Sequence, residues 1–194
     1  MRVLLFADIG GERGFYHTGD EAMFEVTYAW YRKNYPKCII TTLSKTPQKL
    51  QHLNWPMDRF INRGYFFIMF FKTLIWRLFK INIFTKKEFD FIKLVSNTDR
   101  IHFTGGGNIT SLFTPWLYYS LFVIFLGRLL KKRVILTSQT IGPFRIIDKL
   151  PVIVILNLAD LIVLREEIID NRYGIFLPKL KGMIDSAYFL PAKK

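Results

Sequence analysis

The sequence predicts an α/β fold with one doubly wound, mostly parallel sheet, and three observations support this prediction. Short β-branched and aliphatic runs alternate with helical patterns along the 194 residues. Hydrophobic residues make up 51% of the chain, which is enough for a packed core and excludes a disordered or low-complexity protein. Glycine-rich stretches follow several predicted strands, where folds of this class bind their ligands. We expect a single domain over residues 1–194.

The N-terminal elements are a strand, a helix and a second strand. The run Arg2–Ala7 is predicted as a buried strand because it is short, apolar and followed by glycines. A helix is expected from Asp20, its predicted N-cap, to about Asn34, because Pro36 prevents its continuation. Residues 37–41 form the next candidate strand, before a turn into a short helix.

The C-terminal half continues the alternation, which requires crossover helices on both faces of a parallel sheet. We expect a polar helix over 86–96, a strand over 99–104, a helix over 109–130, a strand over 133–137, a helix over 146–158, a strand over 161–164 and a helix from residue 166.

Residues 59–87 form a basic, aromatic-rich segment with seven Lys or Arg residues and no acidic residue. At 100° per residue, its polar positions 72, 73, 77 and 80 fall within about 140°, opposite a large apolar side. This pattern is typical of an interfacial anchor on an anionic membrane. The alternative is a helix that packs its apolar side on the core and leaves a solvated cationic stripe. Neither this segment nor residues 116–126 offers the roughly 20 uninterrupted apolar residues that a membrane span needs.

The charge balance favours anionic partners. Twenty-eight basic and 15 acidic residues give a formal charge of +13, which suits phosphates, anionic lipids or acidic substrates. Nucleic acid is not expected, because the basic residues are interleaved with bulky apolar ones and no recognition motif is present. The single cysteine, Cys38, excludes an internal disulfide framework and suits the cytoplasm.

The loop before the first helix holds candidate proton-transfer residues. His17, Asp20 and Glu21 are titratable groups close together in sequence, and Gly19 lets the backbone approach a ligand. Helix capping by Asp20 and a solvated His17 are the alternative interpretation.

Two later loops hold candidate anion-binding groups. Gly105, Gly106 and Gly107 between a strand and a helix, with Asn108 as the expected cap, provide N–H groups for a phosphate or carboxylate; a tight turn beneath a crossing helix is the alternative. Gln139 and Gly142 follow the next strand and are expected to shape the substrate site. Arg165 is predicted as an anion clamp, or as an ion-pair partner of an acidic neighbour. His52 and His102 are interpreted as structural.

Five motifs, in order, resemble the polysaccharide pyruvyl transferase family. They are Gly19-Asp20-Glu21-Ala22, Gly105-Gly106-Gly107-Asn108, Ser138-Gln139-Thr140-Ile141-Gly142-Pro143, Arg165-Glu166 and Asp185-Ser186-Ala187-Tyr188. The first loop carries His17 where the family often has Asn.

The resemblance implies a Rossmann-like domain that is one half of a two-domain GT-B-type architecture, with the second domain absent from this chain. It implies transfer of a pyruvyl group from phosphoenolpyruvate to a sugar of a cell-surface polysaccharide or exopolysaccharide, forming a ketal. Independently of the resemblance, we expect a cytoplasmic protein, located at the inner face of the membrane if residues 59–87 bind lipid. The resemblance implies no metal and no organic cofactor. Asp20 or His17 would transfer protons, residues 105–108 would hold an anionic group, and Arg165 would clamp charge.

Two other functions stay open at this point. One is a nucleotide-sugar glycosyltransferase of the GT-B type. The other is a non-catalytic module that binds a membrane surface through residues 59–87.

Overall fold

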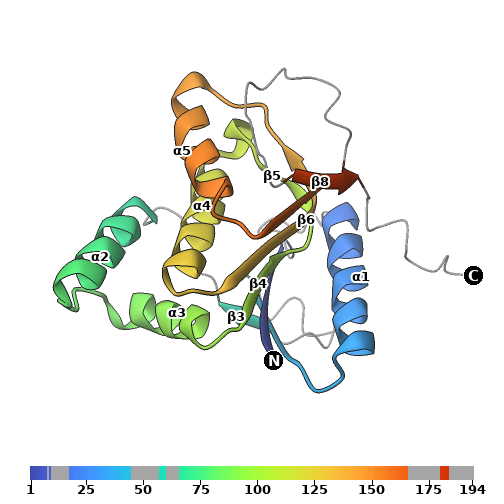
Figure 1. Cartoon of the computed structure of the whole chain (residues 1–194), viewed down its shortest axis with the longest axis horizontal. Helices are drawn as coiled ribbons and strands as arrows, with labels where there is room; N and C mark the ends of the chain where they lie inside the picture. Colours follow the sequence, from blue (N-terminus) through green and yellow to red (C-terminus); the bar gives the residue numbers. More distant parts are fainter. Residues whose placement is uncertain (8, 10–17, 45–56, 60–65, 166–179, 184–194) are drawn as a thin grey trace, which may run out of the picture.

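The computed structural model describes residues 1–7, 9, 18–44, 57–59, 66–165 and 180–183 (Figure 1). Along the chain the elements are β1 (Arg2–Phe6), α1 (Thr18–Asn34), β2 (Ile39–Ser44), β3 (Met57–Arg59), α2 (Phe66–Phe79), α3 (Lys86–Ser96), β4 (Arg100–Phe103), β5 (Gly106–Ile109), the 3-10 helix η3 (Ser111–Phe113), α4 (Thr114–Leu129), β6 (Arg133–Ile141), α5 (Ile146–Leu156), β7 (Leu161–Leu164) and β8 (Leu180–Met183).

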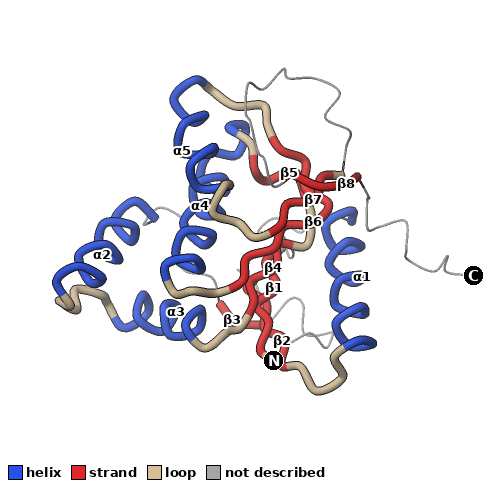
Figure 2. The backbone as a smooth tube through the Cα atoms, in the orientation of Figure 1, coloured by secondary structure: helices blue, strands red, loops and turns tan. Residues whose placement is uncertain are grey.

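The strands form one sheet in the order β3-β2-β1-β4-β6-β7-β8, and β5 pairs with β6 beside this path. Every strand pair in the described residues is parallel. Helix α1 covers one face of the sheet, and α2, α3, α4 and α5 lie on the other side (Figure 2). The predicted α/β class with a mostly parallel sheet is confirmed.

The core has two parts because the central strands are buried on both faces. Val3 and Leu5 of β1 pack with Phe24 and Tyr31 of α1. The alternate residues of β1, such as Leu4, belong to the larger cluster on the α4 side. Successive side chains of a strand point to opposite faces, so a single apolar run supplies both layers.

Helix α4 is the central helix of the larger layer. The segment Ser111–Leu129 is long and apolar enough to cross a membrane, yet 56% of it is buried inside the protein. It contacts α2, α3, α5 and β6. Its apolar character is therefore explained by its place in the core.

Two predicted features of the fold are wrong. The glycine run does not lead directly into a helix, and Asn108 is not an N-cap, because residues 106–109 form β5. Gly106 pairs with Gln139 and Ile109 with Ile141, so pairing with β6 outweighs the local turn signal. Asp20 is not the N-cap of α1 either, because the helix begins at Thr18. Asp20 lies in the first turn, where a carboxylate also meets the positive end of the helix.

His102 has the structural role that the sequence predicts. Its Nδ1 lies 3.1 Å from the hydroxyl of Tyr31, and its Nε2 lies 2.9 Å from the hydroxyl of Thr137. Burial, with a smaller contribution from the nearby Arg100 charge, lowers the pKa of His102 to about 3. The ring is therefore a neutral link between α1, β4 and β6. His52 lies outside the described residues.

We expect His102 to make the protein less stable at acidic pH. The unfolded chain protonates this histidine below pH 6.5 and the folded chain only near pH 3, so the free energy of unfolding falls by about 1.4 kcal/mol per pH unit in this window. Urea denaturation at pH 7 and pH 5 should show the parent protein losing about 2 kcal/mol more than His102→Gln. Equal losses would contradict this origin of the acid sensitivity.

Candidate functional site

The sheet order places the functional loops at one edge. From β1 the chain moves outward through β2 and β3, and then returns to the opposite side of β1 with β4. In open α/β sheets, ligands bind beyond the carboxyl ends of the strands at such a reversal. The region beyond the carboxyl end of β4 begins at Thr104. The N–H of Thr104 donates to the carbonyl of Phe6, at the end of β1, over 3.0 Å.

Helix α1 and the glycine run are in contact through Met23, in the second turn of the helix. A Cβ atom on Gly105 would meet the Sδ of Met23 at 2.5 Å, and Gly105 has φ of +120°. Packing and backbone conformation therefore require glycine at this position. Asp20 lies three residues before Met23, on the same face of α1 and one turn nearer to its N-terminus.

Two other glycines are not explained by packing. Among the described residues, a Cβ atom on Gly19 or Gly107 would have no heavy atom within 4 Å, and neither glycine has a positive φ. Gly19 is exposed and Gly107 half-buried. Open space above bare backbone is what close approach of a ligand needs.

A buried hydroxyl marks the same edge. Thr104 is completely buried, and within the described part of the chain its Oγ1 has no hydrogen-bond partner. Leaving such a group unsatisfied costs about 1–3 kcal/mol. Unsatisfied buried groups are rare in native proteins, so this one distinguishes the end of β4.

The backbone of β6 changes direction where the third motif begins. Ser138 is buried and has φ of +53°, in the left-handed region that non-glycine residues rarely adopt. The pairing of β6 with β7 shifts between Leu136 and Gln139. Strained residues of this kind concentrate at functional sites. Nothing in the sequence signals the conformation of Ser138.

Arg165 joins this group directly after β7. Its Nη2 donates to the hydroxyl of Thr140 over 2.8 Å, and its backbone N–H donates to the carbonyl of Gln139 over 3.1 Å. Gln139 is buried, and its side-chain amide donates to the carbonyl of Thr137. Because Gly106 pairs with Gln139, the structure connects the glycine run to Arg165 through one strand.

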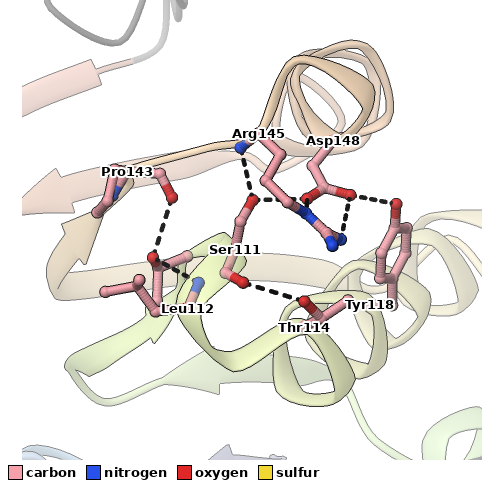
Figure 3. A network of polar contacts seen from close by, with 8 residues as sticks. Ser111, Leu112, Thr114, Tyr118, Pro143, Arg145 and Asp148 are labelled. Carbon is pink, nitrogen blue, oxygen red and sulfur yellow. Dashed lines mark hydrogen bonds and ion pairs between the residues drawn. The ribbon is translucent and has the colours of Figure 1, made fainter.

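A polar network anchors the loop that follows β6 (Figure 3). The buried carboxylate of Asp148 accepts from Ser111 Oγ and from Tyr118 Oη, each over 2.6 Å, and pairs with Arg145 over 2.7 Å. Ser111 Oγ also accepts from the backbone N–H of Arg145, and Ser111 N–H donates to the carbonyl of Pro143. These bonds connect η3 and α4 to the start of α5.

The network fixes the protonation states of its members. Burial by itself raises the pKa of Asp148, but hydrogen bonds from Arg145, Ser111 and Tyr118 outweigh it and lower the pKa to about 2. Burial and the hydrogen bond to Asp148 raise the pKa of Tyr118 to about 12. Asp148 is therefore a permanent anion that holds the neutral hydroxyls of Ser111 and Tyr118 and the cation of Arg145 in place.

Sequence reasoning missed this network. The available signal was a single carboxylate in the first turn of a helix that is apolar apart from this residue and Lys149, three residues after Arg145. Of the predicted site residues, the structure brings Gly105 against α1 at Met23, one turn after Asp20, and connects Gly106 with Gln139 and Arg165. Gly142 is buried at the end of β6, where its N–H donates to Ile109. His17 and residues 166 and 185–188 lie outside the described residues.

The described side chains offer no metal centre. Among them, no group of three or more His, Cys, Asp or Glu residues could hold a metal ion. The polar groups at this edge of the sheet are instead N–H groups, hydroxyls, an amide and a guanidinium, which suit an anionic or hydroxylated ligand.

A family model described as polysaccharide pyruvyl transferase matches residues 17–191, which includes all of the site elements described above. The chain belongs to the polysaccharide pyruvyl transferase family. It is thus an enzyme of the transferase class, and its family implies a glycan acceptor. No functionally curated protein matches the chain.

We expect Asp148→Asn to destabilise this transferase. The amide cannot accept from Ser111, Tyr118 and Arg145 together, and a buried charged acceptor is lost, so the free energy of unfolding should fall by about 2–4 kcal/mol. Urea denaturation measures the loss. The exposed control Asp90→Asn should stay within about 0.5 kcal/mol of the parent protein, and a similar value for Asp148→Asn would contradict the anchoring role.

Proposed function

We propose that this transferase moves the pyruvyl group of phosphoenolpyruvate onto two hydroxyls of one sugar residue, forming a cyclic ketal. The observation that supports this most is the meeting, at the carboxyl edge of the sheet, of the α1 N-terminus, the open backbone at Gly107 and the Arg165–Thr140 pair. These elements combine N–H groups and a guanidinium, which bind anions, with the carboxylate of Asp20 in the first turn of α1.

The reaction defines what the site must supply. Phosphoenolpyruvate is an enol ester with a phosphate and a carboxylate. An acid protonates its methylene carbon, two sugar hydroxyls add to the neighbouring carbon, and phosphate leaves with the electron pair of the broken C–O bond. A base accepts the protons of the two hydroxyls. Catalysis therefore needs proton transfer together with fixed positive groups that hold two anions.

We assign anion binding to the guanidinium of Arg165 and to backbone N–H groups. A guanidinium binds a carboxylate or phosphate through two parallel hydrogen bonds, and Thr140 orients the Arg165 side chain from one side. The N–H groups in the first turn of α1 and the backbone at Gly107 are further donors toward an anion. The predicted role of Gly105 in binding is less direct, because Met23 occupies the space beside it.

The proton-transfer role goes to Asp20. Its carboxylate is half-buried in the first turn of α1, on the helix face that contacts the glycine run through Met23. His17 immediately precedes α1 and stays the second candidate. A second domain that completes a GT-B-type site stays a prediction.

We expect Arg165→Gln to weaken binding of phosphoenolpyruvate by about 10- to 100-fold, since a charge-assisted bidentate contact is lost. Thermal stabilisation by phosphoenolpyruvate measures the binding. Arg133→Gln removes the same charge at the opposite end of β6 and should leave binding unchanged. Stabilisation by a nucleotide sugar, with none by phosphoenolpyruvate, would favour the glycosyltransferase instead.

We expect Asp20→Asn to lower kcat for ketal formation by about 100-fold or more while phosphoenolpyruvate still binds, because the amide keeps the size but cannot accept a proton. Release of inorganic phosphate in the presence of a glycan acceptor measures the rate. The control is Glu25→Gln, an exposed acidic residue of the same helix. An unchanged rate for Asp20→Asn would exclude Asp20 as the base.

A further inference from the structure

Helix α2 is oriented with its polar side toward the protein. Lys72 makes two hydrogen bonds of 2.8 and 2.9 Å to the buried carboxylate of Glu88 in α3. Thr73 is completely buried and donates to the carbonyl of Met69, which is itself buried. Thus the side on which the sequence places two of its polar residues faces the core. The alternative of an apolar side packed on the core is therefore wrong for Phe71 and Leu78, which are exposed, whereas Phe70 does pack on the core and Arg77 is solvated as that alternative has it.

Glu88 fixes this orientation. Its carboxylate accepts from the backbone N–H of Thr85 and completes a capping box at the start of α3, while it also accepts from Lys72. Burial alone raises the pKa of Glu88, but the hydrogen bonds from Lys72 and Thr85 outweigh it and lower the pKa. The carboxylate therefore stays charged and keeps Lys72 turned inward. Phe70 adds a ring contact with Phe125 of α4, with centroids 4.5 Å apart.

The opposite side of α2 is apolar and faces solvent. Five residues, here called the outer arc, lie within about 100° of each other on the helix surface at 100° per residue. The outer arc consists of Ile68, Phe71, Ile75, Leu78 and Phe79, and it continues into exposed Ile81 and Ile83. Phe71, Leu78 and Phe79 are 63%, 71% and 66% exposed. Clustered exposure of this kind marks a binding surface, whereas single exposed apolar residues do not.

The charges next to the outer arc are basic. Arg77, Lys80, Lys86 and Lys87 are all exposed, and the sequence from residue 59 to residue 87 contains no acidic residue. The first acidic residue after this segment, Glu88, is engaged by Lys72. The exposed Asp90 lies one turn after Lys86 and Lys87, so the surface combines large apolar side chains with an excess of positive charge.

We propose that the outer arc of α2 binds the surface of an anionic lipid bilayer. Aromatic and aliphatic side chains enter the boundary between headgroups and acyl chains, and the flanking cations meet the anionic headgroups. A symmetric contact with a second copy of this chain would bring the same cations together, and their repulsion disfavours a second copy as the partner of the outer arc. Helix α2 is also the outermost helix on its side of the sheet, beyond α4 (Figure 1). This inference does not depend on the proposed reaction.

Vesicle sedimentation tests the proposal. The parent protein should pellet with vesicles of phosphatidylcholine and phosphatidylglycerol in equal parts, pellet far less with phosphatidylcholine alone, and be released by added salt. Replacing the three most exposed residues of the outer arc (Phe71→Ser, Leu78→Ser and Phe79→Ser together) should weaken vesicle binding by about 100-fold. Arg77→Gln with Lys86→Gln should weaken it by about 10-fold or more.

A control removes exposed apolar residues from other elements, at the end of α1, in the following turn and in β2. Trp30→Ser, Tyr35→Ser and Ile39→Ser, at residues that are 47%, 41% and 57% exposed, should together leave vesicle binding unchanged. Because the outer arc contributes little to the core, its triple variant should keep the parent's circular dichroism and thermal midpoint. Failure of the parent protein to pellet overturns the proposal, as does equal binding by the outer-arc variant. A parent dimer that the outer-arc substitutions dissociate would identify a second copy as the occupant and overturn it too.

Discussion

Burial of the sheet on both faces is the constraint on which the rest of this structure depends. The central strands bury side chains on both faces, so each must be covered on two sides, and parallel pairing requires the chain to cross over between strands. Those crossovers bring all carboxyl ends to one edge. The reversal of direction at β1 and β4 then separates the loops enough for a ligand. The candidate site is thus a consequence of covering the sheet, and it is assembled from segments far apart in sequence.

The same edge of the sheet carries a rigid hydrogen-bond network and two residues whose conformation or hydrogen bonding is energetically unfavourable. The Asp148 network joins η3, α4 and α5 through charge-assisted bonds, and it does so at the loop that follows β6. Ser138 lies within β6 and has a strained backbone, and Thr104 directly follows β4 and has a hydroxyl without a hydrogen-bond partner among the described residues. Such costs persist only where the surrounding structure is stable enough to impose them. The hydrophobic layer around α4 supplies that stability.

Helix α2 shows how one ion pair decides what a surface presents. Lys72 is drawn inward by Glu88, and this rotation leaves Phe71 and Leu78 outside. Had the helix turned by half a revolution, the outer arc would have joined the core and Lys72 would have faced water. A polar interaction inside the protein therefore creates an apolar face outside it.

The sequence by itself determined the α/β class, the positions of β1, β4, β6 and β7, and the placement of Arg165 directly after a strand, because these follow from local periodicity and from loop composition. The structural role of His102 also followed from its place in an apolar strand. Tertiary structure decided the rest. Residues 106–109 became a strand only because β6 offered a pairing edge, and α1 packed on Gly105 only because β5 lies beneath it. The helical pattern defines two sides of α2. Which of them is buried depends on Glu88, which binds Lys72 from 16 residues further along the chain. The local sequence of α2 does not identify this partner.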